Sequence, residues 1–425
     1  MQRSQMRPQK RMMRSAVFAL LLASCAVLLL RSSPLALAAS PPSCSPQVFA
    51  VSPSPNPSTG VSYLNGIAAA ASNDIWAVGF TYDASSNTQP TLIEHYTGSA
   101  WSVVASPSPG GYSNYLTGIS LLSSTNIWAA GYQQSTSFAP VTSLMEQWNG
   151  SSWNVIPSAN ASGTGTYTYL QGVSALSATD IWAVGYSQPA SADSTATFTE
   201  HWDGSSWSVV PSPNLGSQYN SLSGVAGVSS TDVWAVGSSG DPAGNDIPIA
   251  EHWNGTAWSI VPTPSVVSGD LLAVTALSST DVWAVGNFVS SASPSLLTFI
   301  EHWDGAAWSV VPSPNYPGVS ENSLNGIAAD SASDIWAVGH YVATNNTTKI
   351  TAATVLTLAL HWNGTTWSIV PSASPGGSAP QDELAGVVAL SPTQAWAVGR
   401  ATGQNGGQTL IEHTVRNPTR LMCPR

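Results

Sequence analysis

The chain has 425 residues, and only 8% of them are charged, against about 25% in typical soluble domains. Six of its eleven Lys and Arg residues precede residue 39, where no Asp or Glu occurs. The remaining chain therefore combines five basic with twenty-two acidic groups, a net charge of −17. Because phosphate groups are held by clustered Lys and Arg, this balance argues against nucleic acids and anionic membranes as partners.

Residues 1–38 predict a secretory signal peptide. Basic residues precede an apolar run over residues 16–30, and Ala36-Leu37-Ala38 supplies a small-residue cleavage site. The run is shorter than the roughly 20 residues of a membrane span, so we expect no transmembrane segment in the mature chain. Two alternatives stay open: an uncleaved N-terminal anchor, and a lipoprotein modified at Cys25.

Residues 47–415 repeat one motif seven times, first as Asp74-Ile75-Trp76-Ala77-Val78-Gly79. Its tryptophans recur at intervals of 49 to 60 residues, as Trp76, Trp128, Trp182, Trp234, Trp283, Trp336 and Trp396. Self-similarity at such a period is typical of repeat architectures. We expect residues 39–46 to be a short linker and residues 416–425 a C-terminal tail.

Each repeat contains four short runs with strand composition, named A to D here in chain order. In the third copy they are residues 170–176, 181–186, 198–202 and 207–210, and Asp203-Gly204 marks a hairpin between C and D. The prediction is an all-β fold, a seven-bladed β-propeller of four-stranded antiparallel blades. All eighteen tryptophans fall on strands B, C or D, where packed blades would bury them.

The seventh repeat lacks a strand D after Glu412-His413-Thr414-Val415. The segment 47–56 aligns with residues 207–214 of the third copy, so the N-terminal strand is predicted to complete the last blade and close the ring. Cys44 and Cys423 flank these two strands. In an oxidising compartment we expect a disulfide between them; the alternative is two free thiols.

The predicted loops differ between the two rims of the propeller. The A–B and C–D turns are short, whereas the B–C and D–A loops are long and variable, which favours them as the binding face; the alternative is that they only solubilise the protein. Strand A begins at the channel mouth with Tyr63, Tyr115, Tyr169, Ser221, Asp270, Ser323 and Glu383. The residues expected to contact a ligand there are Tyr63, Tyr115, Tyr169, Asn220, Asp270, Asn322 and Glu383.

A Glu-His pair recurs on strand C, first as Glu94-His95, and invites a metal-binding or acid–base interpretation. Strands are ~4.8 Å apart, so strand C lies about 10 Å further from the axis than strand A, and its histidines cannot meet at one metal. Neighbouring residues on a strand also face opposite sides. We therefore expect these groups to form structural hydrogen bonds between blades, and predict neither a metal site nor a cofactor.

Enzyme signatures are weak in this sequence. It contains no G-x-S-x-G, H-E-x-x-H or P-loop, and Arg400 is the only arginine within the repeats. Acids at the mouth offer the one catalytic possibility, a carboxylate pair for glycoside hydrolysis. The weak candidates for it are Asp270, Asp382 and Glu383.

The repeats resemble those of secreted bacterial β-propeller proteins with D-[IV]-W-A-V-G and E-H-W-[DN]-G-x-x-W motifs. The chain is more distantly similar to kelch and galactose-oxidase propellers, but the kelch Gly-Gly doublet is missing from its strands. The resemblance implies the architecture and no particular activity.

The sequence as a whole predicts a monomeric binding or scaffolding module, either secreted or held at the cell surface. Its partner would be an extracellular glycan, expected to be neutral, or a protein, bound on the B–C and D–A face. One alternative is a propeller glycoside hydrolase or lyase that uses the acids at the mouth. Another is a structural cell-surface protein without a small ligand.

Overall fold

The computed structural model describes residues 47–57, 60–163, 165–190, 192–216, 218–291, 295–343, 353–377, 380–403 and 406–417. The chain divides into two compact units, Met1–Ala38 and Ala39–Arg425, and the described residues all belong to the second. The predicted signal peptide, the lipidation at Cys25 and the Cys44–Cys423 disulfide fall outside them and stay predictions. Within the described ranges, no helix has the length and apolar character needed to cross a bilayer.

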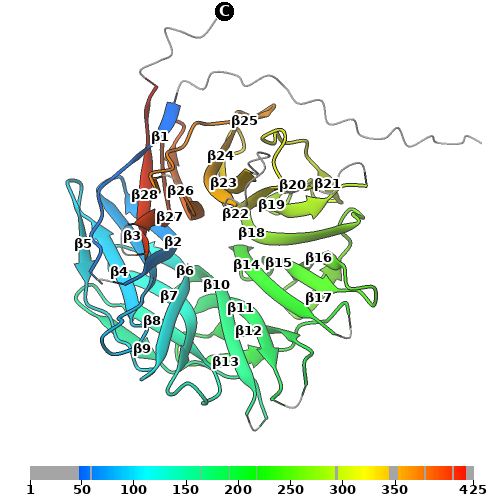
Figure 1. Cartoon of the computed structure of the whole chain (residues 1–425). Helices are drawn as coiled ribbons and strands as arrows, with labels where there is room; N and C mark the ends of the chain where they lie inside the picture. The colour runs from blue at the N-terminus through cyan, green and yellow to red at the C-terminus, as the bar shows by residue number, and fades with distance from the viewer. Residues whose placement is uncertain are drawn as a thin grey trace, which may run out of the picture. The chain divides into compact units, whose positions relative to one another are not determined.

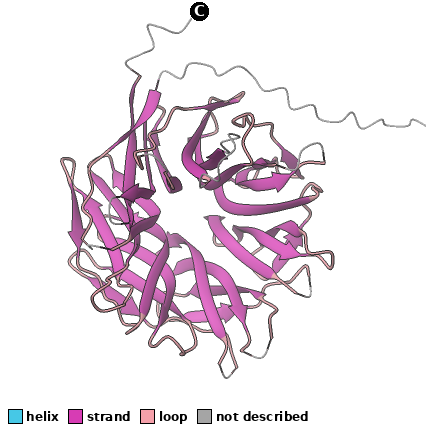
Figure 2. Ribbon diagram, in the orientation of Figure 1, coloured by secondary structure: helices cyan, strands magenta, loops and turns pink. Residues whose placement is uncertain are grey.

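The second unit is an all-β propeller with seven blades around a central axis, as Figures 1 and 2 show. The innermost strands, A, are β2 (Ser62–Ala71), β6 (Ser113–Ser123), β10 (Tyr167–Ser177), β14 (Asn220–Ser229), β18 (Ser268–Ser278), β22 (Glu321–Ser331) and β26 (Glu383–Ser391). The B strands are β3 (Asp74–Thr81), β7 (Asn126–Gln134), β11 (Asp180–Gln188), β15 (Asp232–Gly240), β19 (Asp281–Val289), β23 (Asp334–Ala343) and β27 (Gln394–Gly403).

The C strands are β4 (Thr91–Tyr96), β8 (Thr142–Trp148), β12 (Ala196–Trp202), β16 (Asp246–Trp253), β20 (Leu296–Trp303), β24 (Thr354–Trp362) and β28 (Gly406–Arg416). The outer D strands are β5 (Trp101–Val104), β9 (Trp153–Ile156), β13 (Trp207–Val210), β17 (Trp258–Val261), β21 (Trp308–Val310), β25 (Trp367–Ile369) and, for the last blade, β1 (Gln47–Val51). Each blade is antiparallel in the order A-B-C-D, and one parallel bridge, Leu296 to Glu321, links the fifth and sixth blades. The predicted fold class is confirmed.

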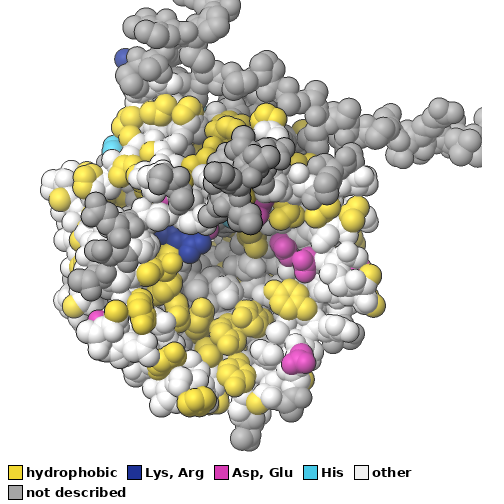
Figure 3. Space-filling model, viewed as in Figure 1, with side chains coloured by type: hydrophobic (Ala, Val, Ile, Leu, Met, Phe, Trp, Pro, Cys, Tyr) yellow, Lys and Arg dark blue, Asp and Glu magenta, His cyan; other side chains and the backbone are white. Residues whose placement is uncertain are grey.

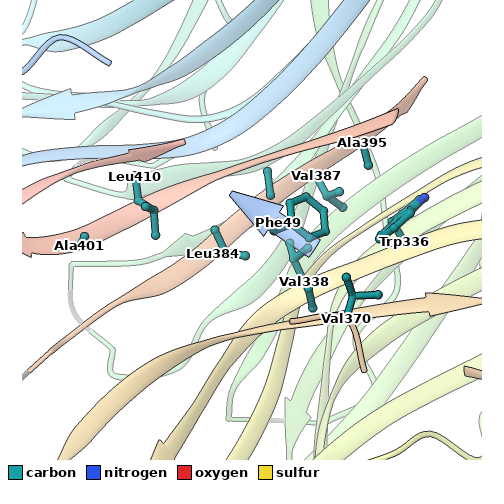
Figure 4. Close-up of a cluster of buried hydrophobic side chains, with 11 residues drawn as sticks. Phe49, Trp336, Val338, Val370, Leu384, Val387, Ala395, Ala401 and Leu410 are labelled. Atoms are coloured by element: carbon teal, nitrogen blue, oxygen red, sulfur yellow. The ribbon is translucent and has the colours of Figure 1, made fainter. Parts of the chain in front are cut away.

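The N-terminal strand closes the ring as predicted. β1 pairs antiparallel with β28, from Gln47 opposite Arg416 to Val51 opposite Glu412. Phe49 takes the place of the strand D tryptophan of the other blades. It is 3% exposed, and its ring meets Trp336 of the sixth blade edge-on with 5.4 Å between centroids (Figure 4).

The core consists of the interfaces between blades. Trp182 of the third blade packs against Trp258 of the fourth with 5.2 Å between ring centroids, and equivalent pairs recur around the ring. The seven strand B and six strand D tryptophans are all buried, as predicted. The five strand C tryptophans are only half-buried; Trp202 uses its indole N–H to donate to the Ala178 carbonyl at 3.1 Å.

The glycine that ends each strand B motif has a structural cause. Strand A carries a β-bulge at this level, between Leu170 and Gly172 in the third blade, and the bulge pushes the Tyr169 carbonyl against Gly185. A Cβ on Gly185 would overlap that carbonyl oxygen. The glycine therefore lets strands A and B approach closely just below the channel mouth.

Candidate binding site at the channel mouth

The structure brings two residues from each blade to the mouth, one from strand A and its partner from strand B. The partner is always the residue after the motif glycine. In blade order the pairs are Tyr63–Phe80, Tyr115–Tyr132, Tyr169–Tyr186, Ser221–Ser238, Asp270–Asn287, Ser323–His340 and Glu383–Arg400. We call these fourteen residues the mouth ring; sequence reasoning found the first member of each pair and missed the second.

Blades one to three contribute an unbroken chain of six half-buried aromatic rings, here called the aromatic arc: Tyr63, Phe80, Tyr115, Tyr132, Tyr169 and Tyr186. Ring centroids within one blade are 4.7–4.9 Å apart, with interplanar angles of 19–31°. Rings from adjacent blades meet at 4.4 Å and 5.0 Å with angles of 62° and 70°. Figure 3 shows hydrophobic side chains gathered along one side of a central hollow.

The phenol groups of Tyr115, Tyr132, Tyr169 and Tyr186 remain protonated at physiological pH. Burial raises the pKa of Tyr186 to about 12, and burial likewise raises the pKa values of Tyr115, Tyr132 and Tyr169 above the ordinary value of 10.0. A protonated phenol both donates and accepts hydrogen bonds. The arc therefore combines apolar ring surface with a row of neutral hydroxyl groups.

The other four blades form a polar arc. Asn287 Nδ2 donates to Ser323 Oγ at 3.2 Å, His340 Nε2 lies 3.2 Å from Glu321 Oε1, and Glu383 Oε1 lies 2.8 Å from Arg400 Nε. The two arcs meet at Arg400, which sits over the Tyr63 ring with 5.0 Å between guanidinium carbon and centroid.

Asp270 is the acidic member of the polar arc that has no basic partner among the residues that the structure describes. Burial raises the pKa of its carboxyl above the ordinary value, the Ser238 hydroxyl opposes this by hydrogen bonding, and the nearby charge of Asp246 adds to the increase. Of the predicted ligand contacts, the structure thus places Tyr63, Tyr115, Tyr169, Asp270 and Glu383 together in the mouth ring.

Three predicted site residues lie elsewhere. Asn220 and Asn322 are 2% and 1% exposed, and their side chains hold their own D–A loops; Asn220 Oδ1, for example, accepts from the Leu215 and Gly216 amides at 3.1 Å. Asp382 is fully buried and accepts from the Gly376 and Thr402 amides at 2.8 and 2.9 Å. Strand alternation turns each of them away from the mouth, so none is available to a ligand.

Five of the six strand C histidines, all but His413, bond within their own blade, so the prediction of bonds between blades is wrong for these five. Each Nε2 contacts the aspartate that opens strand B, at 2.6–2.9 Å, and each ring packs on the strand B tryptophan. The pairs are His95–Asp74, His201–Asp180, His252–Asp232, His302–Asp281 and His361–Asp334. These histidines are therefore occupied with fixing the A–B turn.

For three of the strand C glutamates the predicted bonds between blades are found. Ser158 donates to Glu200 at 2.7 Å, and the pairs Ser212–Glu251 and Ser372–Glu412 repeat the contact at 2.6 Å. Their carboxyls are fully buried, and burial raises the pKa of Glu200 to about 8. Acids that are buried in separate blade interfaces and bonded to the neighbouring blade are structural groups.

No protein-family model and no curated protein matches the sequence. Among solved structures the chain is similar to YCF48 bound to D1 peptide, with a TM-score of 0.51 and 15% identity, covering 90% of this chain and 99% of that one. It is also similar to YCF48 from Cyanidioschyzon merolae, with a TM-score of 0.48 and 14% identity, covering 86% of this chain and 98% of that one. A protein of unknown function from Dyadobacter fermentans matches with a TM-score of 0.47 and 11% identity, covering 71% of this chain and 94% of that one. At 15% identity, the likeness to the first of these structures shows the fold alone, and the chain is a β-propeller.

Proposed function

We propose that this protein is an extracellular binding or scaffolding propeller that holds an extended segment of a partner protein at the mouth ring. The observation that carries the proposal is the aromatic arc. Six half-buried rings line one side of an opening whose backbone is fixed by seven interlocked blades. Partly exposed aromatic surface with a few polar groups is the usual composition of a recognition site.

The ring geometry favours a peptide over a glycan. Tyr115 contacts Phe80 on one side and Tyr132 on the other, and Tyr169 is likewise flanked by Tyr132 and Tyr186. Rings that pack on each other present edges and hydroxyls to the opening, whereas a sugar stacks on a free ring face. A peptide can use the edges for its side chains and the hydroxyls for its backbone groups.

Secretion is part of this proposal and rests on residues 1–38. A basic start, an apolar run and an A-x-A site direct the chain out of the cytoplasm. The scarcity of charge in the rest of the chain and its polar surface of Ser, Thr, Asn and Gly accord with an extracellular module. The YCF48 structure described as bound to D1 peptide offers a precedent for a propeller that holds a peptide.

The structure gives no support to the hydrolase alternative. A carboxylate pair needs two free acids near one point, but Asp382 is buried in its loop and Glu383 is held by Arg400. Of the three candidates, only Asp270 is neither buried in a loop nor paired with Arg400.

Parallel peptide and glycan arrays probed with the purified full chain test the proposal. We expect binding to a subset of peptides, lost in a Tyr115→Ala, Tyr132→Ala double variant. Tyr96→Ala, which truncates a tyrosine on the opposite rim, is the matched control and should bind as the wild type does. Selective glycan binding instead, or peptide binding that survives the double variant, would contradict the proposal.

A further inference from the structure

The polar arc carries uncompensated negative charge on one side of the mouth. Among the residues that the structure describes, Arg400 and Arg416 are the only Lys or Arg side chains. Arg400 is engaged by Glu383, and Arg416 lies exposed at the end of β28, opposite Gln47. Neither forms an ion pair with Asp270 or Asp246, so negative charge is concentrated on one side of the mouth ring.

Asp270 and Asp246 come from adjacent blades. Asp270 lies in β18 of the fifth blade, and Asp246 begins β16 of the fourth, where its amide donates a hydrogen bond of 3.1 Å to the Ser268 hydroxyl of β18. Ser268 and Asp270 are two residues apart and share one face of β18, so the hydrogen bond from Asp246 to Ser268 brings Asp246 to the side of β18 that carries Asp270. Like charges held together at a half-buried position are relieved by a cation placed between them.

Along the mouth ring, only the fourth blade lies between the aromatic arc and Asp270. Tyr186 ends the arc in the third blade, Ser238 follows in the fourth, and Ser238 is hydrogen-bonded to Asp270. Figure 3 shows acidic groups on the side of the hollow away from most of the hydrophobic band. A ligand that lies on the arc and extends across the fourth blade therefore reaches the acids.

We propose that the segment held at the mouth is cationic: a peptide whose apolar residues lie along the aromatic arc and whose Lys or Arg side chain pairs with Asp270 and Asp246. This inference rests on the proposed function and specifies its partner. The excess of acids over bases in residues 39–425 acts in the same direction, because it attracts cationic and repels anionic segments before contact.

The test uses the full chain and an array of decapeptides of randomised sequence. We expect the bound peptides to be enriched several-fold in Lys and Arg and to release at high salt. An Asp246→Asn, Asp270→Asn double variant should weaken the tightest of them by about tenfold. Its matched control is Asp203→Asn with Asp304→Asn, the same charge change in C–D hairpins, where other blades already carry Asn254 and Asn363 in the same turn.

Each outcome separates the two proposals. Bound peptides without a preference for Lys and Arg, or tight binding that survives the acid variant but not Tyr115→Ala with Tyr132→Ala, would overturn the cationic partner and leave the peptide-binding propeller in place. A folded protein that binds no peptide on the array would overturn both. Equal weakening by the acid variant and its hairpin control would show a general charge effect and also remove the inference.

Discussion

Arg400 donates a hydrogen bond of 3.3 Å from Nη1 to the phenol oxygen of Tyr63, and this contact joins the last blade to the first. The same guanidinium holds Glu383 through Nε and lies over the Tyr63 ring. One side chain thus links the polar arc to the aromatic arc at the seam where the ring closes. Ring closure therefore uses two contacts: β1 pairs with β28 on the outside of the last blade, and Arg400 joins the last blade to the first at the mouth.

Removing the guanidinium should loosen this seam. We expect Arg400→Gln to lower the free energy of unfolding by about 1 kcal/mol, because a half-exposed ion pair and one cation–π contact are lost. Tyr63→Phe should lower the free energy of unfolding by a smaller amount, since it removes only the hydroxyl. Urea denaturation measures both, with exposed Arg416→Gln as the charge-matched control; equal effects of Arg400→Gln and the control would contradict a role for this contact.

The buried glutamates should make stability fall as pH rises. Burial raises the pKa of Glu301 from 4.5 to about 8, and neither of its oxygens has a hydrogen-bond partner among the described residues. The folded state then keeps a proton that the unfolded chain releases. The unfolding free energy is therefore highest below about pH 4.5 and declines towards pH 8, by about 1.4 kcal/mol per pH unit for each such group.

A neutral replacement at this position tests the assignment. Glu301→Gln should flatten the decline in unfolding free energy between pH 5 and pH 8 and raise stability at pH 8 relative to the wild type. Glu301→Leu is a second variant, since the sixth blade already has the fully buried Leu360 there. Denaturation curves at several pH values are the measurement, and an unchanged pH profile in both variants would show that Glu301 is not the group that titrates.

The histidine–aspartate pairs should be replaceable by an amide pair. The second blade has Gln147 Nε2 donating to Asn126 Oδ1 at 3.0 Å where the third has His201 and Asp180 at 2.8 Å. We expect His201→Gln with Asp180→Asn to stay within about 0.5 kcal/mol of the wild type, while His201→Ala costs about 1 kcal/mol through the lost hydrogen bond. Thermal unfolding measures both; a paired variant as unstable as His201→Ala would point to a special role for the imidazole.

The motif glycine should tolerate no side chain. Gly185→Ala places a Cβ on the Tyr169 carbonyl, and separating the two strands there disrupts both the bulge and the mouth pair. We expect a loss of more than about 3 kcal/mol or failure to fold. Gly240→Ala, whose new Cβ meets the side chain of the exposed Tyr219 at 3.3 Å, serves as the control and should cost less than about 1 kcal/mol.

The prediction of a disulfide between Cys44 and Cys423 can be tested on the purified protein. Gln47 lies opposite Arg416, so the strands that Cys44 precedes and Cys423 follows are paired. We expect both thiols to resist alkylation until the protein is reduced, and reduction to lower stability by about 2–4 kcal/mol. Free alkylation of the folded, unreduced protein would show two thiols instead.

Much of the fold could be predicted because the same strand pattern recurs in seven repeats. The β-rich runs, the hairpin turns and the orphan strand at the N-terminus together specify blade number, strand order and ring closure. The register at the mouth could not be predicted in the same way. The β-bulge between Leu170 and Gly172 shifts the register of strands A and B by one residue, and no residue type in the sequence marks its position. The pairing of Tyr169 with Tyr186 therefore could not be predicted.

The errors at the site have simple physical causes. Asn220 precedes the mouth residue Ser221, and alternation along a strand sends it to the other face, where its amide serves the loop. Proximity in sequence was therefore the wrong criterion. The hydrogen-bond partner of His201 could not be predicted because the two residues are not directly opposite each other. Asp180 lies diagonally across the strand pair, two residues before Trp182, which is opposite His201.

The pairing of β1 with β28 also determines how the protein would respond to mechanical tension. Gln47 starts β1 and Arg416 ends β28, and they face each other at the same end of the antiparallel pair. A pull that separates the two chain ends would load these backbone hydrogen bonds one after another, as in unzipping, rather than all together in shear. The last blade would open first under force, and a covalent bond between Cys44 and Cys423 would carry the load past it.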